Sequence, residues 1–208
     1  MRTRCPFPLL LAALLALAAC AKSTADWRAD MASEDPYARL LAVVGLGRSG
    51  DPEAVDDLCA AVSDGDEEVA REAREALARF APVAVPRLLD GLADRQARGE
   101  RDRSVAAALL IGMGAPAVPL MAAALRDGTH ARAPIALTLG RMGEPGVLAL
   151  AALLREPDAE LAALAARSLA GSGEAGRAAL PALAEALARP EPEVVKQAAA
   201  ARAALRAD

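Results

Sequence analysis

The chain has few aromatic residues, a single histidine and three cysteines. Aromatic side chains make up 2% of its 208 residues, whereas alanine, leucine and valine are abundant. Sheets usually require aromatic and β-branched side chains, and alanine and leucine are strong helix formers. The composition therefore predicts an all-α fold, and the length is sufficient for one domain with a hydrophobic core.

The scarcity of histidine and cysteine also limits the chemistry. His130 is the only histidine, and we expect it to be exposed near the start of a helix. One imidazole with no cysteine nearby cannot complete a tetrahedral zinc site. No Ser-His-Asp or Cys-His set and no phosphate-binding loop are recognisable. We expect a protein that is not an enzyme and has no cofactor, no metal and no catalytic residue.

The charge balance bears on the class of partner. The formal net charge is −4, and nucleic-acid binding calls for a basic face. We therefore expect no nucleic-acid partner. A quarter of the residues are charged, so the body of the chain is not expected to span a membrane.

Residues 1–19 have the features of a secretory signal. Arg2 and Arg4 precede an uninterrupted apolar run of 11 residues, Leu9–Ala19. This run is shorter than the ~20 residues that a membrane-spanning helix needs. A basic start, a short apolar middle and small residues at the end are typical of a signal peptide.

The end of this segment resembles the bacterial lipobox. Leu17, Ala18 and Ala19 precede Cys20, and the resemblance implies cleavage before Cys20 and lipidation of its thiol. An ordinary cleaved signal, with Cys20 incidental, is the alternative. Several acyl chains anchor a protein firmly, whereas one does so only marginally. We expect a lipid-anchored protein of the bacterial envelope that faces the periplasm, on the outer membrane if the cell has two membranes.

Two further expectations concern the residues after the signal. Residues 20–34 are predicted to be the lipidated cysteine followed by a polar tether, and 35–208 to be the folded body. Trp27 is expected to cover the open end of the first helical pair, with contact to the lipid interface as the alternative. Cys59 lies beside Leu58 on an apolar stripe, so we expect a buried, unreactive thiol.

A sequence pattern recurs through the body with a period near thirty residues. In each copy, the first predicted helix ends at a glycine or alanine: Gly50, Ala81, Gly114, Gly143 and Gly173, with spacings of 31, 33, 29 and 30. An independent apolar register pairs residues seven positions apart, which lie on one helical face. Its members are Val55/Val62, Val85/Leu92, Val118/Leu125, Val147/Leu154 and Leu180/Leu187. Self-similarity at this period indicates a solenoid.

Each unit is predicted to be two antiparallel helices. Asp35, Asp66 and Asp158 share one register and suit the N-cap of the first helix. Proline is tolerated in the first turn of a helix, so the prolines are interpreted as start signals. They are Pro36, Pro52, Pro86, Pro119 and Pro181. Pro134 lies beyond the expected first turn, so the fourth unit is expected to begin late or to kink.

These phrases resemble the HEAT-repeat family, and more narrowly the short HEAT-like units of bilin lyases. The resemblance rests on "LGRSGDPEAV" (46–55), "IGMGAPAVPLMAAAL" (111–125) and "LGRMGEPGVLALAALL" (139–154). It implies a right-handed α-solenoid of about five and a half units: five over 35–189 and a final helix or cap over 190–208. The chain lacks the several His-Glu pairs that a HEAT-like di-iron hydroxylase needs.

Arginines recur in two registers. Arg39, Arg71, Arg103, Arg132 and Lys196 lie near one position of the first helix and are expected to pair with acids of the adjoining unit. Arg48, Arg79 and Arg141 stand two residues before the closing Gly or Ala. A row of arginines along one rim suits carboxylates of a protein partner, with plain solvation as the alternative.

Three functions follow from these features. The first is a non-enzymatic, lipid-anchored scaffold that binds an unidentified protein through its repeat surface, since solenoids present extended surfaces. The second is a lyase or ligand carrier similar to bilin lyases. The third is a purely structural subunit of a complex.

Overall fold

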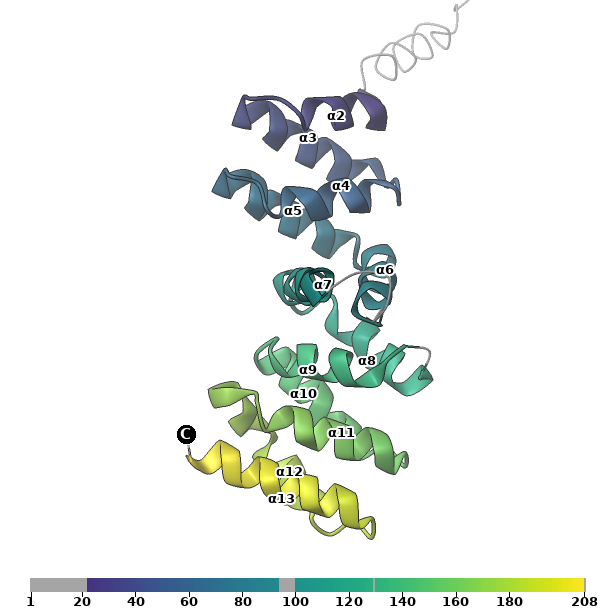
Figure 1. Cartoon of the computed structure of the whole chain (residues 1–208), viewed down its shortest axis with the longest axis vertical. Coiled ribbons are helices and arrows are strands. Elements are labelled where there is room, and N and C mark those ends of the chain that lie inside the picture. The colour runs from purple at the N-terminus through teal and green to yellow at the C-terminus, as the bar shows by residue number, and fades with distance from the viewer. Residues whose placement is uncertain (1–21, 94–99, 129, 208) are drawn as a thin grey trace, which may run out of the picture.

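The computed structural model describes residues 22–93, 100–128 and 130–207, and within these ranges it is entirely helical. Helical hairpins follow one another in chain order along the long axis, from α2 at one end to α13 at the other (Figure 1). This arrangement is the predicted α-solenoid.

Five hairpins and one final helix make up the stack. The first helices of the units are α3 (Pro36–Ser49), α5 (Glu67–Arg79), α7 (Glu100–Met113), α9 (Arg132–Gly140) and α11 (Ala159–Leu169). The second helices are α4 (Ala54–Ala61), α6 (Ala81–Ala93), α8 (Val118–Asp127), α10 (Glu144–Leu153) and α12 (Leu180–Ala186). A 3-10 helix (Gly173–Ala179) precedes α12, and α13 (Pro192–Ala207) ends the stack as a sixth first helix.

The predicted start signals of the first helices are confirmed. Asp35 accepts a hydrogen bond from the backbone N–H of Tyr37 at 3.0 Å and caps α3. Asp66 caps α5 and Asp158 caps α11 in the same way. Each carboxylate satisfies backbone donors that have no partner within the helix, so the register of each unit is set at its first residue.

The prolines follow the prediction with two departures. Pro36, Pro119 and Pro181 lie in the first turns of α3, α8 and α12. Pro52 lies in the turn before α4. Pro86 lies inside α6, so its interpretation as a start signal is wrong. The second unit lacks the turn glycine, and α6 begins at Ala81 directly after Phe80, five residues earlier than expected.

The turn glycines adopt the left-handed conformation that favours glycine. Gly50, Gly114, Gly143 and Gly173 have φ values of 71°, 65°, 71° and 57°. Residues with a Cβ avoid this region, so these positions allow the chain to reverse between paired helices. The fourth unit begins late, as expected: α9 starts at Arg132, with Pro134 as its third residue.

The seven-residue apolar register forms the core. Most of its members are buried, and Val62, Leu180 and Leu187 are partly buried against the same cluster. The cluster extends from Val43 on α3 to Leu205 on α13 without a break in the chain order of the units. Each hairpin therefore buries its apolar face against its neighbours, as the solenoid prediction requires.

The expectation of a polar tether over 21–34 is wrong for residues 24–30. These residues form helix α2 (Thr24–Asp30), which begins with a capping box between Ser23 and Asp26. Helix α2 packs on α3, and the indole of Trp27 lies so close to Gly45 that any side chain at position 45 would overlap it. The expectation that Trp27 covers the first helical pair is confirmed.

The stack changes direction near its middle. Figure 1 shows α7 nearly along its axis, whereas α3, α11 and α13 lie across the view. The change follows the short junction at Phe80, where a single residue separates α5 from α6. Because this junction has no glycine turn, α6 leaves α5 in a different direction from that of the other second helices.

Candidate protein-binding surfaces

The three predicted partner-binding arginines lie at the C-terminal ends of first helices. Arg48 is in the last turn of α3, Arg79 is the last residue of α5, and Arg141 is the C-cap of α9. All three are exposed. They share the rim of the stack formed by the turns within units, which we call the turn rim.

The turn rim is not a uniform row of free charges. Arg79 bonds Glu72 of its own helix at 2.9 Å, and its guanidinium lies against Gly47 of α3. The third unit has Gly112 at the corresponding position, where the stem of Arg74 lies alongside. Arg48 and Arg79 thus belong to neighbouring units, and Arg141 stands two units further along.

The opposite rim, formed by the loops between units, holds a second set of arginines that the sequence did not single out. Arg126 bonds Glu156 at 2.7 Å, and Arg155 lies 2.8 Å from Glu185. Arg189 donates to the backbone carbonyls of Leu154 and Glu156, each at 2.7 Å. These contacts join consecutive loops, so this rim is cross-linked within the chain and we call it the loop rim.

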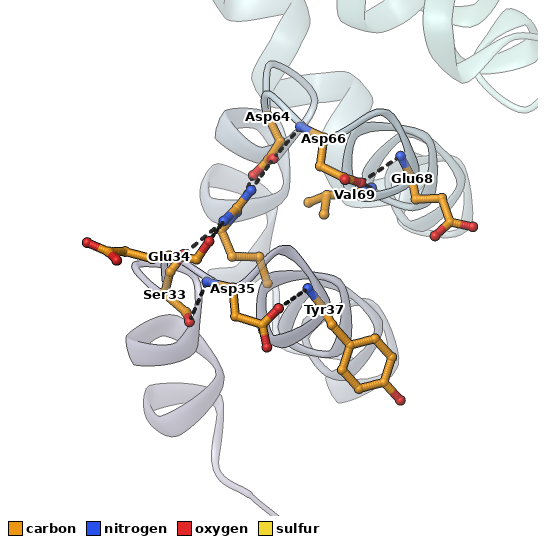
Figure 2. A network of polar contacts seen from close by, with 9 residues as sticks. Ser33, Glu34, Asp35, Tyr37, Asp64, Asp66, Glu68 and Val69 are labelled. Carbon is orange, nitrogen blue, oxygen red and sulfur yellow. Dashed lines mark hydrogen bonds and ion pairs between the residues drawn. The ribbon is translucent and has the colours of Figure 1, made fainter.

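Two arginines of the first helices complete the loop rim. Arg39 holds Asp64 through two hydrogen bonds of 2.8 and 2.9 Å and also donates to the carbonyl of Ser33 (Figure 2). Arg132 bonds Asp158, the cap of the next unit, at 2.8 Å. The arginine beside Asp64 lowers the pKa of that carboxyl, and at Asp158 the pKa falls chiefly through the backbone N–H of Leu161.

The predicted pairing of first-helix cations with neighbouring units therefore holds for Arg39 and Arg132 but fails for two others. Arg71 lies 3.3 Å from Glu75 and Lys196 lies 3.6 Å from Glu193, each partner being in the same helix. Acids one helical turn away are within easy reach and make the longer contact unnecessary. The side chain of Arg103 is outside the described part of the structure.

Hollows on the surface of the described residues include one of about 530 Å³ on the loop rim, between Arg155, Glu185 and Arg189, and three others. The N-terminal groove, about 650 Å³, lies between α2 and α3 and includes Trp27, Leu41 and Arg48. The kink cleft, about 490 Å³, lies between α4, α6 and α7 and includes Cys59, Arg87 and Asp90. The α11 groove, about 370 Å³, crosses α9, α11 and α13 and is lined by both charges.

Cys59 lines the kink cleft, and His130 lies beside it against Asp90, which also lines the cleft. Cys59 is half-buried, and burial, reinforced by the nearby Asp56 charge, raises the pKa of its thiol to about 11. A thiol with this pKa is almost fully protonated at neutral pH, which agrees with the expected unreactive cysteine. His130 is not exposed as expected: its imidazole is 20% exposed, and Nε2 lies 3.2 Å from Asp90.

The described residues hold neither a metal site nor a membrane-spanning helix. Within residues 22–93, 100–128 and 130–207, no three His, Cys, Asp or Glu side chains converge as a metal site requires. Nor does any helix in these ranges combine the length and apolar character needed to cross a bilayer. The predicted signal segment and Cys20 lie outside the described residues.

The family comparison decides the class of this stack. Residues 24–110 match the model for HEAT repeats, and the match begins at the first residue of α2. Residues 24–110 are therefore HEAT repeats. Beyond the matched residues, helical hairpins continue through α11 and α12, with glycine turns at Gly114, Gly143 and Gly173 and an aspartate cap on α11.

Solved structures similar to this chain come from several sources. Human deoxyhypusine hydroxylase in complex with glycerol is 19% identical, with a TM-score of 0.42, over 99% of this chain and 92% of that one. An engineered protein is 19% identical, with a TM-score of 0.34, over 89% and 97% of the two chains.

The complex of CpcE and CpcF of phycocyanin lyase from Nostoc sp. PCC7120 also resembles it. That structure is 22% identical, with a TM-score of 0.31, over 85% of this chain and 74% of that one. No curated protein sequence matches this chain. Similarities of this size assign no activity to it.

Proposed function

We propose that this protein is a non-enzymatic, lipid-anchored scaffold of the bacterial envelope that binds another protein along its turn rim. The observation that carries the proposal is the difference between the two rims. On the loop rim, Arg126 and Arg189 bond groups of neighbouring units, whereas Arg48 and Arg141 on the turn rim are exposed and bond no acid among the described residues.

The turn rim has features that favour binding of an acidic protein surface. Arginine makes paired hydrogen bonds to carboxylates and is enriched among residues that dominate interface energy. Leu137 on α9 is 54% exposed and Leu148 on α10 is 51% exposed, so apolar side chains are also available in the fourth unit. The proposed partner is therefore a protein with a carboxylate-rich patch.

Crosslinking in intact cells, followed by mass spectrometry, tests this proposal. We expect one reproducible partner for the wild-type chain and about tenfold weaker capture for Arg141→Glu, as for loss of an interface arginine worth ~1.4 kcal/mol. The matched control is Arg155→Glu on the loop rim, which leaves capture unchanged. A chain that yields no reproducible partner is instead a structural subunit or spacer.

The anchor is tested separately by membrane fractionation. The proposal rests on the Leu17-Ala18-Ala19-Cys20 motif and predicts that Cys20→Ala moves the protein from the membrane to the soluble fraction. Unchanged membrane association of Cys20→Ala contradicts lipid anchoring and leaves the protein-binding proposal to its own test.

A ligand carrier or lyase is the second candidate, and the kink cleft favours it. The cleft volume of about 490 Å³ is within the range of ligand sites, and its floor includes Val55, Leu88 and Leu109. This candidate predicts that protein purified from its own cells carries an absorbing or apolar small molecule. An absorption spectrum with the 280 nm protein band alone, together with a blank mass spectrum of the extract, rejects it.

A further inference from the structure

The first unit of the stack has an uncovered side. In the other units, a first helix packs on the one before it: Ala76 of α5 meets Gly47 of α3, and Ser168 of α11 meets Gly140 of α9. In each pair, the residue on the later helix lies five positions before the closing Gly or Ala of its own unit. The residue on the earlier helix lies three positions before the closing Gly of its unit. On α3 the corresponding residue is Gly45, and Trp27 occupies this contact instead of a preceding first helix.

Trp27 covers only part of this side of α3. Helix α2 has seven residues, whereas α3 has fourteen, so the N-terminal groove remains open beside the indole. Tyr37 is 65% exposed and Leu41 is 43% exposed, and they lie four residues apart on one face of α3. Leu41 lines the groove together with Val44, which gives this end of the molecule an aromatic and aliphatic surface.

Cations border the same surface. Lys22 lies over the ring of Trp27, 4.8 Å from its centroid, and Arg48 lines the groove from the last turn of α3. The nearest acids are already engaged: Asp30 pairs with Lys22, and Asp26 forms the capping box with Ser23. Apolar and aromatic groups flanked by Lys and Arg are the composition of proteins at the membrane interface.

The position of the proposed anchor selects the partner of this surface. Lys22 lies two residues after Cys20, and two extended residues reach at most ~7 Å. Helix α2 is capped at Ser23, so a lipidated Cys20 would stand three positions before the first capped residue of the folded body. An anchor this short forces the N-terminal end of the stack against the bilayer.

We infer that the N-terminal groove, with Tyr37 and Leu41 beside it, is a membrane-docking surface that rests on the headgroup region of a phospholipid bilayer. This inference deepens the proposed function, because it rests on the anchor at Cys20. Trp27 and the apolar residues of α3 sit at the level of the headgroups, and Arg48, which bonds no acid among the described residues, meets a lipid phosphate. The stack then stands end-on, with Arg48 at the membrane end of the turn rim and Arg141 three units further from the bilayer.

Trp27 is the only tryptophan, so its fluorescence reports on this surface alone. The experiment uses residues 20–208 with Cys59→Ala, so that Cys20 is the one thiol that maleimide lipids can capture. Vesicles of phosphatidylethanolamine and phosphatidylglycerol, with or without brominated acyl chains, then receive the tethered protein. We expect brominated lipids to quench the fluorescence of Trp27 in the tethered protein that has no substitution in the docking surface.

Two matched variants locate the contact. Leu41→Asp is expected to lower the quenching to about half or less, because interfacial binding scales with the apolar area that enters the membrane. Leu148→Asp alters a leucine on α10 that is 51% exposed, compared with 43% for Leu41, and is expected to leave quenching unchanged. Far-ultraviolet circular dichroism of both variants verifies the helical fold.

The result separates the docking surface from the anchor. Absence of quenching in the wild-type protein, or an equal loss in Leu41→Asp and Leu148→Asp, overturns the docking surface. Because the tether is made chemically, neither result depends on whether cells lipidate Cys20. Fractionation of Cys20→Ala decides that question independently.

Discussion

A single added methyl group at Gly146 provides a strict test of how the hairpins pack. Gly146 is the third residue of α10 and is buried against the end of α9. A Cβ at this position would lie 3.0 Å from the carbonyl carbon of Leu139 and 3.0 Å from the Cβ of Met142, and closer still to the Leu139 oxygen. Backbone atoms cannot rotate away, so Gly146→Ala must displace α10 from α9.

The expected magnitude follows from two opposing effects. Overpacking of a tight site costs about 1–3 kcal/mol, and backbone contact places Gly146→Ala at the upper end. Alanine is favoured over glycine in a helix by roughly 0.5–1 kcal/mol, which offsets part of this cost. We expect a net destabilisation of about 2 kcal/mol, or a Tm lower by about 4–8 °C for a chain of this size.

Thermal and urea unfolding, followed by circular dichroism at 222 nm, measure this change. Gly65→Ala is the matched control, because an added Cβ at Gly65 meets nothing within 4 Å. We expect the control to be neutral or slightly stabilising, since alanine restricts the unfolded chain. Equal stability of Gly146→Ala and Gly65→Ala would refute the close approach of α10 to α9.

Three further outcomes are expected. Arg39→Ala lowers the urea midpoint more than Arg71→Ala, because Arg39 joins two loops through Asp64 whereas Arg71 contacts only acids of its own helix; equal midpoints contradict this difference. The pKa values of Asp64 and Asp158 are lowered in the folded state. Their contribution to the free energy of unfolding is therefore complete above the unfolded pKa near 4 and is lost as the pH falls through the folded pKa values. In an acid titration, Asp64→Asn should lose less stability than the wild type. Cys59 in the native protein is alkylated slowly at pH 8 and faster as the pH approaches 11. The urea-unfolded chain is alkylated quickly at pH 8. Equal alkylation rates of the native and unfolded chains at pH 8 rule out the raised pKa.

The hairpins were predictable because their signals are local. The N-cap aspartates, the left-handed glycines and the seven-residue apolar spacing each lie within a few positions of the structure they specify. Where the local signal is missing, the prediction failed: without a glycine before it, Pro86 was interpreted as a helix start and lies inside α6. Helix α2 was missed because its polar sequence carries no apolar stripe, and its packing rests on Trp27 and on the bond from Arg28 to Asp57 of α4.

The contacts of the loop rim depend on the angle between units, which no single helix encodes. Arg126 and Glu156 are 30 residues apart, as are Arg155 and Glu185. This separation equals the repeat period, so pairing each arginine with an acid one period downstream is the signal that finds them. The predicted row of Arg48, Arg79 and Arg141 lies on one rim. The ion pair between Arg79 and Glu72 could not be predicted, because it depends on side-chain conformations that the sequence does not specify.

The indole of Trp27 also bears on how identical molecules behave at high concentration. A solenoid whose terminal helix is uncovered exposes the same kind of surface that joins its own units. Another molecule can add to this surface head to tail, and such addition does not close and yields fibres. In this chain the indole of Trp27 already occupies the contact at Gly45 that another molecule would need. Head-to-tail addition at this contact would first have to displace the indole from Gly45.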